Sequence, residues 1–186
     1  MLWLSADLAS KTPTGLALWR GSELLRTAVL RPVGAAGKVR LGGTVYATEM
    51  AAWLAAFCAP APLDERPQVL VAESVHVATH NGRPLVAPAL ALSAMHGRVG
   101  AWWLATAPER RPMVEVDVNT WRSVVREHLS NGKLAARAWS WPKKGEDCKP
   151  VAQALVREHY GREVSEDEAD AVLVGVWALR TRAVEV

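Results

Sequence analysis

Residues 2–30, LWLSADLASKTPTGLALWRGSELLRTAVL, contain three apolar runs separated by short polar segments. Residues 2–8 and 24–30 have the length of buried strands, and residues 15–20 form a third run between them. Gly21 lies where a tight turn would join the second run to the third. The segment therefore predicts an antiparallel meander at the start of the chain.

After the meander, the pattern changes to an alternation of helices and strands. Residues 69–73 form a further apolar run, and residues 113–118 alternate in the manner of a strand. Helical patterns occupy residues 44–58, 87–103, 120–129, 150–160 and 165–179. This order predicts an α/β fold with a five-stranded mixed sheet flanked by helices. The first three strands are expected to be antiparallel, and the later strands parallel to the first.

Length, charge and cysteine content limit the kinds of domain, partner and metal site that this chain can have. A chain of 186 residues, half of them hydrophobic, favours one compact domain over residues 1–186. The net charge of +3 suits a polyanionic partner but is too small to identify one. Cys58 and Cys148 are far apart and offer no zinc site. Because no uncharged run approaches ~18 residues, we expect no membrane contact. Asp7 and Lys11 follow the first apolar residues too soon for a signal-peptide core, so we expect a cytoplasmic protein.

Two carboxylates lie where predicted strands end. Asp7 closes the first apolar run, and Glu73 closes the run over residues 69–73. Each has a structural alternative, because Asp7 can form a turn and Glu73 can be a solvated strand terminus. Ligands of open α/β sheets bind at the carboxyl ends of the strands. The pair therefore indicates a site at that edge.

The last predicted helix carries two further acids. In residues 164–171, VSEDEADA, Ser165 and Glu168 form a capping-box pattern. Asp167 and Asp170 then share one helix face. The helix dipole favours acids in a first turn for structural reasons alone. Asp170 is harder to explain in this way, because the uncharged run that follows predicts burial and a buried acid must be paired or bind a cation.

The candidate ligands are all carboxylates, which are the ligands of hard cations such as Mg²⁺ or Mn²⁺. Two such ions about 3.5 to 4 Å apart can activate water on one side of a phosphodiester and stabilise the leaving oxygen on the other. The predicted two-ion site consists of Asp7, Glu73, Asp167 and Asp170.

These elements, in this order, resemble the RuvC branch of the RNase H-like superfamily. The resemblance comprises Asp7 followed by Thr14 and Gly15, Glu73 within AESV, and the helix opening DEADA at residues 167–171. It implies an RNase H-like fold in which the four acids hold the catalytic ions. It also implies a crossover junction endodeoxyribonuclease that acts as a homodimer on four-way (Holliday) DNA junctions in recombination and repair.

The resemblance further implies that basic residues ahead of the penultimate helix contact the DNA backbone. The candidate DNA-binding residues are Lys149, Lys143, Lys144, Arg122, Arg83 and His76. The helix over residues 87–103, which begins at Ala87 and ends at Trp103, is apolar on more than one face. We expect it to form the dimer contact, and the alternative is that it lies in the core.

Departures from the family pattern indicate a divergent member, for which a phage source is one interpretation. Ala9 replaces a family glycine, His76 replaces an aromatic residue, and residues 139–142 have no recognised counterpart. Other functions stay open: an RNase H-like or YqgF-like nuclease acting on RNA, or a non-catalytic nucleic-acid-binding module. The chain is too short for the duplicated domain of an actin-like ATPase or sugar kinase.

Overall fold

A five-stranded sheet forms the centre of the computed structural model, which describes residues 1–8, 13–30, 52, 54, 56–57, 66–75, 79–80, 83–84, 86–105, 111–130 and 149–184. The strand order is β3-β2-β1-β4-β7. The strands are β1 (Leu2–Asp7), β2 (Thr14–Arg20), β3 (Glu23–Leu30), β4 (Val69–Glu73) and β7 (Val114–Val116). The first three strands are antiparallel, and β4 and β7 run parallel to β1. This topology confirms the predicted mixed sheet.

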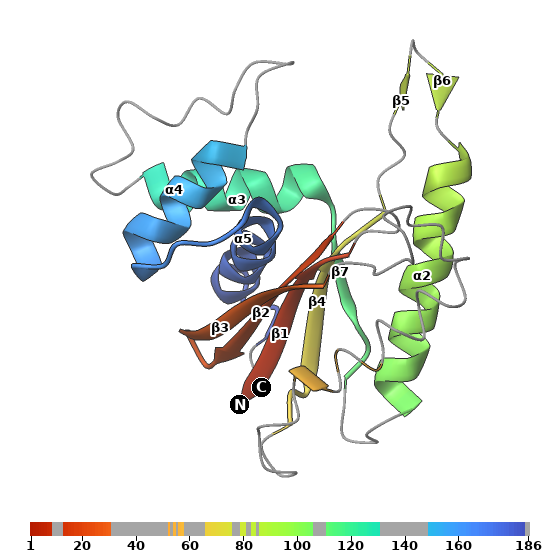
Figure 1. Cartoon of the computed structure of the whole chain (residues 1–186), viewed down its shortest axis with the longest axis horizontal. Helices are drawn as coiled ribbons and strands as arrows, with labels where there is room; N and C mark the ends of the chain where they lie inside the picture. Colours follow the sequence, from red (N-terminus) through yellow and green to blue (C-terminus); the bar gives the residue numbers. More distant parts are fainter. Residues whose placement is uncertain are drawn as a thin grey trace, which may run out of the picture.

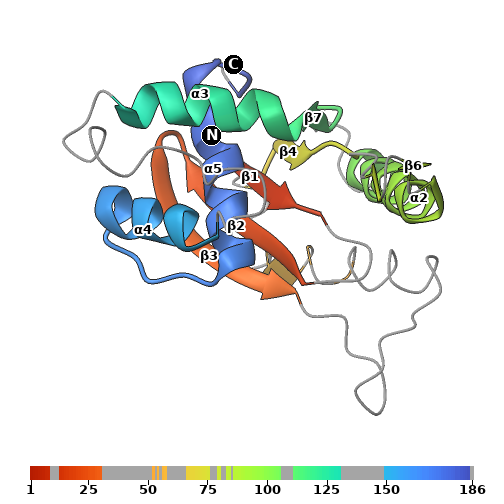
Figure 2. The ribbon, with the colours of Figure 1, turned by 90° about the horizontal axis from the view of Figure 1, so that it is seen from above.

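Helices cover both faces of the sheet (Figures 1 and 2). One face carries α3 (Val118–Ser130), α4 (Lys149–Tyr160) and α5 (Glu166–Arg180), and the other carries α2 (Val86–Ala105). Within the predicted helix over residues 44–58, only four positions are described; they are helical, and Leu54 and Phe57 are buried. None of the helices in the described part of the chain is long and apolar enough to span a membrane.

Helix α5 is the central helix of its layer. Its uncharged run is buried over residues 171–176, as the sequence predicts. The Trp3 and Trp19 rings stack beneath it with centroids 5.1 Å apart. A Cβ atom on Gly175 would lie 2.5 Å from the Trp19 ring, so only glycine allows this approach. The helix therefore lies unusually close to β1 and β2.

Two local predictions are wrong. The strand expected over residues 113–118 is shorter, and the helix expected over residues 120–129 begins earlier, at Val118. The reason is that Asp117 ends the strand and caps α3: Asp117 Oδ1 accepts a hydrogen bond from the Asn119 backbone N–H at 2.8 Å. The polar segment after Glu73 contains a short hairpin formed by β5 (Thr79–His80) and β6 (Arg83–Pro84).

Candidate active site at the carboxyl edge of the sheet

The strand-end acids of β1 and β4 lie side by side. Ala6 pairs with Ala72 in the parallel ladder, so the next residues, Asp7 and Glu73, are level with one another. Neighbouring strands are about 4.8 Å apart, and residues at the same level point to the same face of a sheet. Asp7 and Glu73 are both half-buried. Strand register therefore brings together two of the four predicted acids.

A glycine brings the first turn of α5 to the same place. On the other side of β1, Asp7 pairs with Gly15 of β2. A Cβ atom added to Gly15 would lie 1.7 Å from the backbone oxygen of Asp167. The backbone of α5 thus touches β2 at Asp167, next to the strand position of Asp7.

A buried hydrogen bond sets the position of α5 along β1. Ser5 Oγ donates to the carbonyl oxygen of Ala171 at 2.7 Å and accepts from Trp19 Nε1 at 2.9 Å. From Ser5 to Asp7 the strand advances about 6.6 Å. From Ala171 back to Asp167 the helix covers about 6 Å. Asp7 and Asp167 are therefore at matching heights along the direction of β1. The half-buried Asp170 directly precedes Ala171, whose carbonyl accepts the Ser5 hydrogen bond.

Glu73 is connected to the helical layer by its side chain. Trp121 of α3 is fully buried, and its Nε1 donates a hydrogen bond to Glu73 Oε2 at 2.7 Å. Sequence reasoning assigned no role to Trp121. The available signal was its position, one helical turn after the end of β7, the strand that pairs with Glu73.

The capping box that starts α5 is present as predicted. Ser165 Oγ accepts from the Glu168 backbone N–H, and the Ser165 backbone N–H donates to Glu168 Oε2 at 2.9 Å. Thr27 of β3 donates to Glu168 Oε1 at 2.7 Å, which ties the helix start to the sheet. Burial acts to raise the pKa of Glu168, but the hydrogen bonds from Ser165 and Thr27 outweigh it and hold that pKa below its usual value.

The lowered pKa of Glu168 predicts a pH-dependent contribution to stability. The stabilisation is fully present above the unfolded-state pKa of about 4.3 and is lost as pH falls through the lower folded-state pKa. Glu168→Gln should therefore lower the free energy of unfolding near neutral pH, and the difference from wild type should shrink below about pH 4. Urea denaturation at several pH values measures this difference. Glu158→Gln, exposed on α4, is the control; a Glu168→Gln difference that is constant with pH would contradict the assignment.

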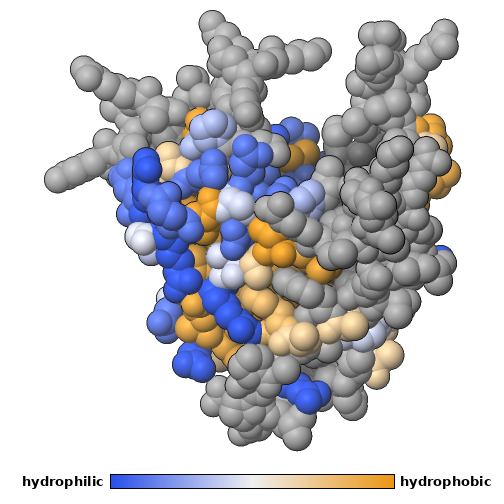
Figure 3. Space-filling view, viewed as in Figure 1, coloured by the Kyte–Doolittle hydropathy of each residue, from blue (hydrophilic) through white to orange (hydrophobic). Residues whose placement is uncertain are grey.

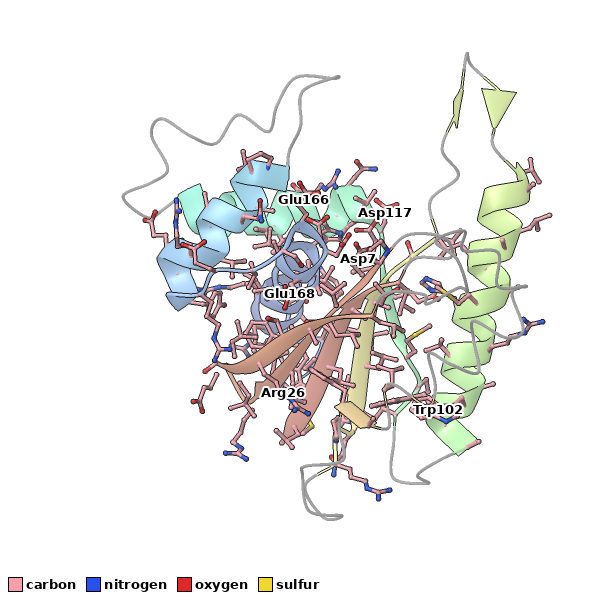
Figure 4. The ribbon with its side chains drawn as sticks, in the orientation of Figure 1. Asp7, Arg26, Trp102, Asp117, Glu166 and Glu168 are labelled. Atoms are coloured by element: carbon pink, nitrogen blue, oxygen red, sulfur yellow. The ribbon has the colours of Figure 1, made fainter. Side chains whose placement is uncertain are left out.

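A further acid, missed by sequence reasoning, lies at the same edge. Asp117 follows β7 and is exposed. In Figure 4, Asp7, Asp117 and Glu166 lie at the end of the sheet where β1, β7 and α5 meet. The available signal was a carboxylate near the end of a predicted strand, as for Asp7, although Asp117 fell inside the strand expected over residues 113–118. This end of the molecule is thus rich in carboxylates.

The arrangement suits a hard cation by its backbone positions and donor atoms. Within the described residues, no three His, Cys, Asp or Glu side chains form a group ready to hold a metal ion. The argument that a cation could bind here depends on two features of the backbone: the strand register and the contact at Gly15, which only glycine permits. All four predicted ligands supply oxygen, which suits Mg²⁺ or Mn²⁺.

The predicted DNA-binding residues are only partly described. His76, Lys143 and Lys144 lie outside the described residues, and only the backbone is described for Arg83 in β6 and Lys149 in α4. Lys149 is the first residue of α4, which starts at the same end of the molecule where β1, β4 and β7 end (Figure 1). Arg122 is half-buried on α3, with its guanidinium carbon 5.1 Å from the centroid of the Trp121 ring.

Solved structures resemble this chain over almost its whole length. T. thermophilus RuvC in complex with a Holliday junction substrate superposes with a TM-score of 0.60 over 97% of this chain and 96% of its own, at 13% identity. The chain has the RuvC fold. A second structure of Thermus thermophilus RuvC gives a TM-score of 0.53 over 98% of this chain and 97% of its own, at 17% identity.

A eukaryotic structure shares the RuvC fold as well. The yeast mitochondrial Holliday junction resolvase gives a TM-score of 0.54 over 97% of this chain and 78% of its own, at 14% identity. No family model matches the sequence, and no curated protein matches it. At such low identity the likeness establishes the RNase H-like, RuvC-type fold, and the predicted site lies at the carboxyl edge of that fold's sheet.

Proposed function

We propose that this chain is a structure-selective endodeoxyribonuclease that cleaves four-way DNA junctions with the help of two divalent metal ions. The observation that carries the proposal is the contact at Gly15, which brings Asp167 of α5 beside Asp7 of β1, next to Glu73 of β4. The RuvC fold supports the choice of a nuclease, and one of its solved structures is a complex with a Holliday junction substrate.

In this proposal, Asp7, Glu73, Asp167 and Asp170 hold the ions. Bound Mg²⁺ or Mn²⁺ supplies a lowered pKa for the attacking water and charge stabilisation for the phosphodiester. The protein contributes a rigid frame: the strand register sets the spacing of Asp7 and Glu73, and the buried Ser5 hydrogen bond sets the height of α5. The carboxylates then need little rearrangement before reaction.

The decisive experiment compares two substrates. A synthetic four-way DNA junction and an RNA/DNA hybrid are incubated with the full chain in Mg²⁺, in Mn²⁺ and in excess chelator. We expect cleavage of the junction in either metal and none in chelator. Cleavage of the hybrid but not the junction would identify an RNA nuclease instead. Junction binding without cleavage in either metal would identify a non-catalytic module.

We also propose that Lys149 contacts the DNA backbone, with Lys143, Lys144, Arg122, Arg83 and His76 as further candidates. Each phosphate contact releases counterions, so Lys149→Ala should weaken junction affinity and reduce the magnitude of the salt slope by about 1. Gel shifts at several salt concentrations measure both quantities. Arg157→Ala, at the other end of α4, should change neither. If Lys149→Ala also leaves junction affinity and salt slope unchanged, Lys149 is only a solvated residue.

Homodimer formation through α2 is part of the proposal. The helix buries one face, including Met95, Val99 and Trp103. The opposite face has exposed residues at alternating spacings of three and four, which is the pattern of a packing seam between helices. These residues are Ala87, Leu90, Ala94, Gly97, Ala101 and Leu104. Figure 3 shows apolar atoms at the outer edge of the molecule on the side of α2.

Gly97 lies in the middle of this seam, and a Cβ atom there would contact nothing within 4 Å. Gly97→Glu should therefore leave the fold intact while placing a charge in the dimer contact. We expect a shift from dimer to monomer in sedimentation and loss of symmetric junction cleavage. His159→Glu, exposed on α4, should stay dimeric. A wild-type chain that is monomeric and active would refute the dimer.

A further inference from the structure

One hydrogen bond links a candidate ligand to the helical layer that covers it. The fully buried Trp121 donates from Nε1 to Glu73 Oε2 at 2.7 Å. We infer that Trp121 is a positioning residue that holds the Glu73 carboxylate in the orientation needed to bind a divalent cation. The inference rests on the proposed function, because it assigns Glu73 to that cation.

The choice of acceptor sets Trp121 apart from the other fully buried tryptophans. A buried indole N–H usually has a hydrogen-bond partner. Trp3 donates to the Gly21 carbonyl, Trp19 to Ser5 Oγ, and Trp103 to the Arg111 carbonyl. Those three acceptors are neutral, whereas Glu73 is a carboxylate. Hydrogen bonds to ionised acceptors are about twice as strong as neutral ones, so this contact can fix the rotamer of Glu73.

A neutral hydrogen-bond donor is better suited to orienting a metal-binding carboxylate than a positively charged side chain is. The indole N–H only donates, and it carries no charge. It can therefore hold one carboxylate oxygen without cancelling the negative charge that attracts a metal ion. A lysine or arginine in the same place would orient Glu73 but would compete electrostatically with the bound cation.

Trp121 is itself held firmly. Its backbone N–H donates to the Asp117 carbonyl at 3.1 Å in the first turn of α3, directly after β7. The Ser74 backbone N–H donates to the Val116 carbonyl at 2.8 Å, which joins the end of β7 to the end of β4. The donor and acceptor of the Trp121–Glu73 hydrogen bond are therefore carried by adjoining segments whose backbones are bonded together.

The test measures metal affinity directly. Trp121→Phe keeps an aromatic ring and removes the N–H donor. Calorimetric titration of the full chain with Mn²⁺ should show affinity weakened about 10- to 100-fold. Trp103→Phe is the matched control: it loses an equally buried indole hydrogen bond, at 2.9 Å to the Arg111 carbonyl, in the α2 layer. It should bind Mn²⁺ as the wild type does.

Two further measurements separate positioning from a purely structural role. Excess Mn²⁺ should restore the junction-cleavage rate of Trp121→Phe, because the missing hydrogen bond weakens binding of the ion and not the fold. In the unmodified chain, Mg²⁺ should shift the indole N–H resonance of Trp121 in NMR spectra and leave that of Trp103 in place. This measurement needs no variant to fold.

The outcomes distinguish this inference from the proposed function. If Trp121→Phe binds Mn²⁺ as tightly as the wild type, or if saturating Mg²⁺ leaves the Trp121 resonance unmoved, the positioning role is overturned while the proposed nuclease stands. If the wild type binds neither Mn²⁺ nor Mg²⁺, the proposed metal site fails, and the role of Trp121 fails with it.

Discussion

Asp7→Asn, Glu73→Gln and Asp170→Asn should each abolish most junction cleavage while leaving the fold intact. Each change removes a charge but little volume, at a half-buried position. Metal ions contribute several kcal/mol of transition-state stabilisation. Losing that contribution corresponds to a fall of about 10³-fold or more in rate. Single-turnover cleavage of a labelled junction measures the loss.

The control for these variants is Glu115→Gln. Glu115 lies on β7, and its carboxylate contacts His96 of α2, on the sheet face opposite α5. It should cut at the wild-type rate. Asp7→Asn should also retain junction affinity, because removing an acid beside the scissile phosphate removes repulsion. An Asp170→Asn enzyme that cuts as fast as the wild type would show that Asp170 is not a ligand.

Among the glycines that the structure describes, Gly15 is the one where an added methyl group, as in Gly15→Ala, should have the largest effect. Its Cβ atom would lie 1.7 Å from the Asp167 backbone oxygen, so β2 and α5 must separate. Overpacking of this kind costs about 1–3 kcal/mol. A displacement of about 1 Å in a catalytic group can lower the rate about 100-fold. We therefore expect reduced stability in urea denaturation and a further loss of cleavage in folded protein.

Gly100→Ala is the matched control for this variant. A Cβ atom at Gly100 of α2 would meet Met113 at 3.8 Å, an ordinary contact. Alanine favours a helix over glycine by about 1 kcal/mol, so this variant should be at least as stable as the wild type. If Gly15→Ala were equally harmless, the close approach of α5 to β2 would not be needed to build the site.

Patterns local in the sequence determined most of the elements and the candidate acids. The apolar runs of β1 and β4 end in Asp7 and Glu73, and Ser165 with Glu168 marks the start of α5. Such signals depend on a few neighbouring residues, which is why strand ends and caps are readable. The same local reading failed at Asp117, because a strand end and a helix cap coincide in one residue there.

Tertiary structure alone decided how these acids meet. The sequence places Trp121 shortly after a predicted strand, but only the structure shows that Trp121 donates to Glu73 and that Gly15 touches the backbone of Asp167. Both contacts join segments more than forty residues apart, and each depends on strand order, register and helix packing together. The sequence by itself thus determined which carboxylates lie at the ends of which strands and helices. The packing of α3 and α5 on the sheet decided which of these carboxylates lie close together, because the distances between side chains on different elements exist only once the layers are assembled.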